Sequence, residues 1–352
     1  MCLYPRLIKN KKYEPNKKNG GHVPPLIDER TLYVPIGCQN CIECDKQKRT
    51  NWRTRLLEEV KHNTQKGYFI TLTFSDENYK KLYEKVKEEL QQRIKNATEN
   101  KEIEKLKKKA TGYSLDNAIA AKAIRKFLNR WRKKYKRSVR HWLITEIGHK
   151  GTENIHLHGI IWTDHEKIKT LAAIWKYGYV WDGNNKNEKK ENYVNAKTVN
   201  YITKYITKKD EKHKTYKPII LTSAGIGSGY INTLNAQANK YKPNQTNEQY
   251  ITPTGTKLNL PIYYRNKIYS EEEREKLWIE KLNKQKRYVL GAEIDVSEGE
   301  EEYIKAIEHA RQKNIEMGYL TEVQQWNREQ YEQQTRKINQ LTRLQNAQDK
   351  AR

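Results

Sequence analysis

The segment at residues 154–162 constrains the fold most strongly, because apolar and imidazole side chains alternate along it. Its run IHLHGII begins at Ile155, and His156 and His158 lie two residues apart within it. Successive side chains of a strand point to opposite faces, so the two imidazoles share one face and Leu157 lines the other. The pattern predicts a strand that presents half of a metal site.

A second predicted strand, at residues 140–147, brings a carboxylate to the same face. A hairpin that turns about Gly151 pairs Glu146 with His156, because both lie five residues from that glycine. Cross-strand partners on one face of a sheet lie close enough to bind one ion. Two histidines and a carboxylate with open positions suit catalytic Mg²⁺ or Mn²⁺ better than a closed structural zinc site. The alternative is a strand face that carries two histidines and no metal.

A predicted helix at residues 197–209 carries two Tyr-x-x-Lys repeats. Tyr201 and Tyr205 are four residues apart and share a helix face, and Lys204 and Lys208 form a second stripe beside them. A phenol has a pKa of about 10, so it is almost fully protonated at neutral pH. A nearby ammonium together with a metal-polarised phosphate would make the phenolate a usable nucleophile. In the alternative interpretation the tyrosines pack in the core and the lysines bind phosphate.

The order of the remaining predicted elements favours an α+β fold. A strand rich in aromatic and β-branched residues at 68–74 comes first, and an amphipathic helix at 115–136 precedes the hairpin. This order suits a compact domain with a mostly antiparallel sheet. We also expect a solvated helix or helical hairpin at 77–110, a helix at 166–175, a short strand at 177–181 and a polar loop at 182–192.

The chain divides by composition into four consecutive segments. Residues 1–66 form an irregular and helical segment that contains the cysteines, and residues 67–212 form the α+β domain with its helical insertion at 77–110. Residues 213–270 form a loop-rich extension. Residues 271–352 are helical in composition without a sustained heptad, which favours a peripheral or interaction segment.

The charge is concentrated in the first three quarters of the chain. Residues 1–270 carry 54 basic and 26 acidic side chains, whereas residues 271–352 carry 15 and 17. Such a local excess predicts a polyanionic partner; the alternative is a soluble protein that is merely basic. The helix at 115–136 interleaves aromatic and cationic side chains, which suits single-stranded DNA, although Phe127 and Trp131 are better explained as its core face. The candidate DNA contacts are Arg125, Lys126, Arg130, Arg132, Lys133 and Lys134.

The four cysteines suggest a structural zinc site. Cys38, Cys41 and Cys44 follow one another at short spacing, with Cys2 as a distant fourth ligand, and free thiols are the alternative. Four cysteines are too few for a secreted disulfide scaffold, and no apolar run approaches the roughly 18 residues of a membrane span. We therefore expect a protein of a reducing cytosol without a membrane partner.

Three motifs in this order resemble the HUH endonucleases that start rolling-circle replication. They are the FITLT strand that begins at Phe69, the pair His156 and His158, and the tyrosine helix. The chain is most similar to the replication initiation proteins of small single-stranded-DNA phages, the microviruses of gokushovirus type. The early Cys-x-x-Cys, the Glu-x-Gly before the histidines, the doubled Tyr-x-x-Lys and a later Leu-Pro-x-Tyr-Tyr carry this resemblance over roughly residues 1–270.

The resemblance implies an antiparallel-sheet HUH domain with flanking helices. It implies that Glu146, His156 and His158 hold Mg²⁺ or Mn²⁺ and that Tyr201 and Tyr205 nick origin DNA. The products would be a 5′-phosphotyrosine link, which is later rejoined, and a free 3′-hydroxyl for a polymerase. The implied partners are single-stranded or supercoiled origin DNA and the helicase and polymerase of a bacterial host, in its cytoplasm. A relaxase or single-strand transposase would use the same chemistry, and a non-catalytic basic nucleic-acid-binding protein is the alternative of another class.

Overall fold

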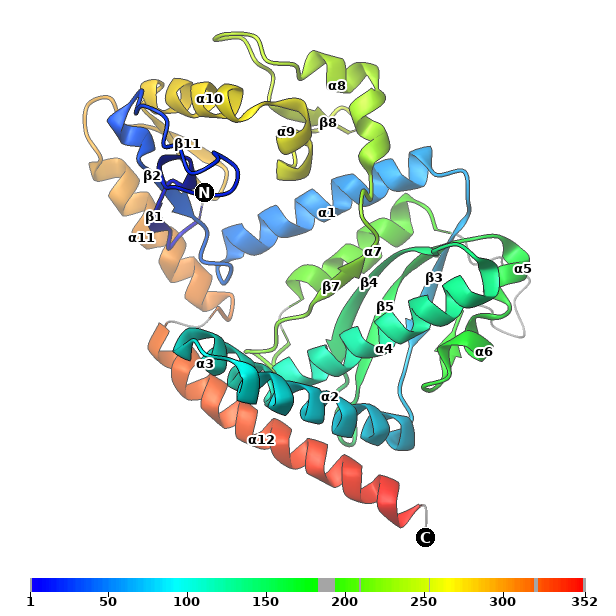
Figure 1. Cartoon of the computed structure of the whole chain (residues 1–352). Helices are drawn as coiled ribbons and strands as arrows, with labels where there is room; N and C mark the ends of the chain where they lie inside the picture. The colour runs from blue at the N-terminus through cyan, green and yellow to red at the C-terminus, as the bar shows by residue number, and fades with distance from the viewer. Residues whose placement is uncertain (1, 183–193, 209, 253, 320–321, 351–352) are drawn as a thin grey trace. The chain divides into compact units, whose positions relative to one another are not determined.

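The computed structural model describes residues 2–182, 194–208, 210–252, 254–319 and 322–350 (Figure 1). The chain forms two compact units, and each is assembled from two separated segments. The first unit comprises Met1–Glu58 and Gly227–Thr321, and the second comprises Glu59–Ile226 and Glu322–Arg352. The polar loop expected at 182–192 falls, apart from its first residue, outside the described residues.

A five-stranded antiparallel sheet is the centre of the second unit. Its strands lie in the order β6-β3-β5-β4-β7, so the histidine strand β5 is the middle one. The predicted α+β class with an antiparallel sheet is confirmed. Strand β7 comes from the region that we expected to be loop-rich. The strands are β3 (Gly67–Leu72), β4 (Arg140–Ile147), β5 (Ile155–Trp162), β6 (Val180–Trp181) and β7 (Ile220–Thr222).

Helix α4 (Gly112–Tyr135) covers the apolar face of this sheet (Figure 1). Leu157 of β5 belongs to the same buried cluster as Ile119 and Phe127 of α4. Trp131 is also buried, so the two aromatic side chains of this helix are core residues, as expected. The face that carries His156 and His158 is therefore the opposite one.

The predicted helical hairpin at 77–110 is present as α2 (Asp76–Asn96) and α3 (Asn100–Lys109). It is not merely solvated, because α2 buries an apolar stripe at intervals of three and four residues and packs against α4. The members of that stripe are Tyr79, Leu82, Val86 and Leu90.

Helix α12 (Glu322–Asp349) is part of the second unit and not a peripheral segment. It packs against α2 and α4. The buried Arg336 donates from Nε to Asp116 Oδ2 at 2.7 Å and from Nη1 to the Glu153 carbonyl at 2.8 Å. Because this helix buries guanidinium groups where an apolar seam would be expected, its role left no heptad pattern in the sequence.

Three shorter helices complete the second unit. The single helix expected at 166–175 is two helices, α5 (His165–Ile168) and α6 (Leu171–Trp175). The tyrosines lie on α7 (Ala196–Thr207), which begins at a capping box made by Asn195 and Thr198.

The first unit contains three two-stranded ribbons and several helices. The ribbons are β1 (Arg6–Lys9) with β2 (Tyr33–Ile36), β8 (Gln249–Ile251) with β9 (Lys257–Asn259), and β10 (Lys286–Val289) with β11 (Ala292–Asp295). The helices are α1 (Ile42–His62), whose end enters the second unit, α8 (Leu234–Ala238), α9 (Ile262–Ile268), α10 (Glu271–Asn283), α11 (Glu301–Glu316) and 3-10 turns at Lys11–Tyr13, Glu29–Thr31 and Ser228–Asn232. In the part of the chain that the structure describes, no helix is both long enough and apolar enough to cross a membrane.

Candidate metal and tyrosine site

The hairpin of β4 and β5 has the register that its spacing predicts. Glu146 is the direct cross-strand partner of His156. The amide of Gly148 donates to the Asn154 carbonyl at 3.0 Å and closes the turn, and Gly151 has a φ of +57°, a conformation that glycine adopts without strain. The carboxylate and the two imidazoles therefore project from one face of two paired strands.

The three candidate metal ligands converge on a single carboxylate oxygen. Glu146 Oε2 lies 3.2 Å from His156 Nε2 and 2.9 Å from His158 Nε2. All three side chains are partly buried, and their donor atoms all lie within 4.8 Å of one another. Two imidazole nitrogens and a carboxylate oxygen can hold a divalent cation and leave positions open for substrate.

The remote nitrogen of each imidazole is held by a neighbour. His156 Nδ1 lies 3.1 Å from the Asn154 carbonyl, and His158 Nδ1 lies 2.9 Å from Thr71 Oγ1. Such contacts fix the ring orientation and present Nε2 to an ion, as the outer partners of metal-bound histidines do. Thr71 is a site residue that sequence reasoning missed, although it lies within the FITLT strand.

Lys208 occupies the other oxygen of the carboxylate. Its Nζ lies 2.7 Å from Glu146 Oε1. Burial opposes ionisation of Glu146, but hydrogen bonds from His156, His158 and Lys208 outweigh it and hold the pKa of this carboxyl well below its usual range. Glu146 is thus ionised at neutral pH, and its Oε2 can bind a cation while Lys208 keeps Oε1.

The structure brings both tyrosines of α7 to this cluster. The Tyr205 ring stacks on His158 with centroids 4.8 Å apart, and its hydroxyl lies 2.8 Å from the Tyr201 hydroxyl. Tyr201 meets Phe69 edge to face and is 50% exposed. The two phenols therefore lie beside the ligand set, open to a strand that approaches from solvent.

The electrostatic surroundings do not favour the Tyr205 phenolate by themselves. Burial, the hydrogen bond with Tyr201 and the negative charge of Glu146 raise the pKa of Tyr205 above its usual value. The Lys208 ammonium is 5.6 Å from the Tyr205 ring and is paired with the carboxylate, and Lys204 is exposed.

The four cysteines of the first unit also come together. Cys41 Sγ lies 3.8 Å from Cys2 Sγ, and Cys38 Sγ lies 4.0 Å from Cys44 Sγ. Tetrahedral zinc–thiolate bonds of about 2.3 Å place neighbouring sulfurs about 3.8 Å apart, so this set fits a Zn²⁺ ion with Cys2 as the fourth ligand. A hydrogen bond from Cys44 lowers the pKa of Cys41 to about 5, which favours the thiolate that zinc requires.

The six candidate DNA contacts on α4 differ in their surroundings. Arg125, Arg132, Lys133 and Lys134 are exposed, and Lys126 is half-buried. Arg130 instead donates to the carbonyls of Ile174 at 2.7 Å and Trp175 at 2.5 Å and to the Tyr177 hydroxyl at 3.0 Å. Its guanidinium therefore joins α4 to the end of α6.

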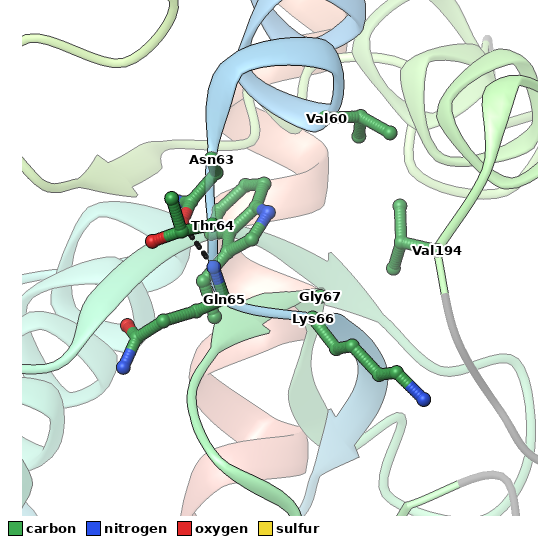
Figure 2. A pocket seen from close by; sticks show the side chains of 8 residues that line it. Val60, Asn63, Thr64, Gln65, Lys66, Gly67 and Val194 are labelled. Carbon is green, nitrogen blue, oxygen red and sulfur yellow. Dashed lines mark hydrogen bonds between the residues drawn. The ribbon is translucent and has the colours of Figure 1, made fainter.

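A pocket of about 380 Å³ lies at the other end of β5 (Figure 2). The polar connection from α1 to β3 forms one wall, where the Gln65 amide donates to Asn63 Oδ1 at 2.9 Å. The pocket contains none of the proposed ligands or tyrosines, and sequence reasoning did not identify it. It is lined by Val60, Asn63, Thr64, Gln65, Lys66, Gly67, Trp162 and Val194.

Comparison with known proteins relates the site to a protein family. A family model described as replication-associated protein ORF2 matches residues 109–210, a stretch that includes β4, β5 and α7. No curated protein and no solved structure matches the chain. The match supports a replication initiator role and DNA as the partner of this protein.

Proposed function

We propose that this protein is a metal-dependent endonuclease and strand transferase of the HUH type that initiates rolling-circle replication. The observation that carries the proposal is the convergence of Glu146, His156 and His158 with two phenols on one face of the sheet. The match to a replication-associated family over the same residues agrees with it.

The ligands have separate tasks in this chemistry. Nε2 of His156, Nε2 of His158 and Oε2 of Glu146 hold the ion, and Lys208 neutralises the remaining carboxylate oxygen. Bound Mg²⁺ or Mn²⁺ supplies positive charge that polarises the scissile phosphate. This charge also offsets the negative field of Glu146, which in the protein alone raises the pKa of Tyr205.

Cleavage exchanges one phosphodiester for another. The hydroxyl oxygen of Tyr201 or Tyr205 forms a bond to phosphorus, and the bond from phosphorus to the 3′-oxygen breaks. The phenol gives up its proton, the leaving 3′-oxygen gains one, and the 5′-phosphate stays on the tyrosine. The bond energy is retained, so strand joining by the reverse attack needs no ATP.

Two neighbouring phenols support a full replication cycle. With hydroxyls 2.8 Å apart, one tyrosine can hold the strand end while the other attacks the regenerated junction. The exposed cations of α4 supply contacts to phosphates. Origin DNA of a phage, the bacterial cytoplasm and a host helicase and polymerase are the corresponding setting and partners.

The nucleophiles are tested with a 3′-labelled pool of random single-stranded oligonucleotides and Mn²⁺. Wild-type protein should acquire the label covalently, as a band that survives denaturing electrophoresis. The double variant Y201F/Y205F should lose this band and retain DNA affinity, while the control Y179F, at a tyrosine that is 68% exposed and lies outside α7, should keep it. A labelled band from Y201F/Y205F would show that other residues are the nucleophiles.

The ligand set is tested by the variant H156A in the same assay. It should give no adduct with Mg²⁺ or Mn²⁺, whereas H165A, at an exposed histidine outside the site, should react like the wild type. Wild-type protein that binds DNA without forming any adduct would favour the non-catalytic alternative.

A further inference from the structure

A second group of metal-ligating side chains lies beyond the end of the tyrosine helix. It consists of His149, in the turn that follows β4, with Asp210 and His213, which follow α7. His213 is buried and His149 is exposed, so the group lies at the surface with one wall inside the second unit. None of these residues belongs to the proposed ligand set of Glu146, His156 and His158.

The distances in this group are those of a nearly formed coordination shell. Asp210 Oδ2 lies 3.2 Å from His149 Nε2 and 2.7 Å from His213 Nδ1. Ligand bonds of about 2.0–2.1 Å in a tetrahedron place neighbouring donor atoms about 3.3 Å apart. A divalent ion could therefore enter between them after small rotations of the carboxylate and the rings.

His213 also has the outer partner that metal-bound histidines usually have. Its Nε2 lies 2.9 Å from Glu153 Oε2, and the same oxygen accepts a hydrogen bond of 2.9 Å from Asn339 Nδ2. A carboxylate on the remote nitrogen fixes the ring and raises its basicity toward an ion on the other nitrogen. The second oxygen of Glu153 pairs with Lys212.

We infer that His149, Asp210 and His213 form a second divalent-cation site, of the zinc type, with Glu153 as its outer partner. An open fourth position would be filled by water. This cation fastens the segment after α7 to the turn of the β4–β5 hairpin, so it holds the tyrosine helix against the strands that carry the first ligand set. The competing interpretation is a proton on His213 between two carboxylates, with no metal.

Zinc titration of the full-length chain distinguishes the two. In the background H156A/H158A, from which metal has been removed by a chelator, calorimetry should count one more Zn²⁺ equivalent than after the further change H149A. Because the His149 side chain is about half exposed, its removal leaves the buried part of the group in place. The control H22A, at an exposed histidine of the first unit, should keep the additional equivalent.

Thermal unfolding gives a readout that does not depend on activity. Saturating Zn²⁺ should raise the Tm of the H156A/H158A protein by roughly 4 °C or more above its effect on the protein that also carries H149A. The change H149D, which restores a ligand, should recover the shift. Equal Zn²⁺ equivalents and equal Tm shifts with and without His149 would overturn the proposal in favour of the protonated histidine.

Discussion

At the scale of single residues, the candidate centre depends on side chains that hold its ligands as well as on the ligands. Thr71 reaches His158 Nδ1 from the neighbouring strand β3. Without it, the ring could rotate, and Nε2 would no longer be directed at Glu146. The threonine thus acts as a positioning residue, one step removed from the ion.

The variant T71V should weaken binding of Mn²⁺ by about 10- to 100-fold, because an outer partner of a metal-bound histidine is lost. Calorimetry of the metal-free protein measures this affinity. The matched control is T73V, since Thr73 lies two residues along and its hydroxyl donates to the Tyr179 carbonyl. Equal Mn²⁺ affinities for T71V and T73V would contradict the role of Thr71.

The first ligand set could be predicted from the sequence, whereas the second group could not. Glu146 and His156 are symmetric about Gly151, and the two-residue period of a strand then fixes the face. His149 and His213 stand in irregular segments where no period relates side-chain direction to sequence spacing. Only the three-dimensional path of the chain after α7 brings them together.

At the scale of elements, α12 is held by buried ion pairs. Arg336 is 1% exposed and Asp116 is fully buried. Taking away one partner leaves an uncompensated charge in a medium that solvates it poorly, which is a larger loss than the pair's own attraction. The attachment of α12 to α4 is therefore more sensitive to substitution than its polar sequence indicates.

The variant R336A should lower the free energy of unfolding by about 3–5 kcal/mol. Urea unfolding followed by circular dichroism measures the loss. The neighbouring exposed residue provides the control, since K337A should be near neutral. A change below about 1 kcal/mol for R336A would show that Asp116 finds another partner or that α12 is not docked.

A pH-dependent contact joins the first 3-10 turn to α10. Lys12 and Tyr13 both donate to Glu275, and although burial opposes its ionisation, these hydrogen bonds lower the pKa of Glu275 below its usual value. A carboxyl with a lowered pKa in the folded state contributes stability above its unfolded pKa of about 4.3 and loses it as the pH falls through the folded value.

The variant E275Q should therefore be less stable than the wild type at neutral pH, by about 2 kcal/mol. The difference should shrink as the pH falls below about 4. Urea midpoints at several pH values test this, with E298Q, at an exposed glutamate, as the control. A difference that stays constant down to acid pH would mean that the charge of Glu275 contributes nothing.

The predicted elements follow local periodicity, and the errors follow contacts over long sequence distances. The strands β3, β4 and β5 and the helix α7 could be predicted because their patterns are local. The edge strand β7 has three residues, too few to show a period. The docking of α12 depends on pairs that lie more than two hundred positions apart in sequence, such as Arg336 with Asp116.

At the scale of the whole molecule, the uneven charge governs how the protein meets DNA. The excess of 54 basic over 26 acidic side chains in residues 1–270 should make binding strongly dependent on salt, because bound cations release counterions from phosphates. With about 6–10 phosphate contacts, the affinity for a labelled single strand should fall about 10³- to 10⁵-fold between about 50 and 200 mM salt. Fluorescence anisotropy measures the slope, and a flat response would remove the electrostatic explanation.

The middle position of β5 has a consequence for how the centre fails under stress. Its backbone is paired with β3 on one side and with β4 on the other, so fraying from an edge of the sheet does not reach it. Amide protons of this strand should exchange only in rare openings of the entire second unit. Heat or denaturant should then leave the imidazole pair intact until that unit gives way, and the centre should vanish in one step together with the sheet.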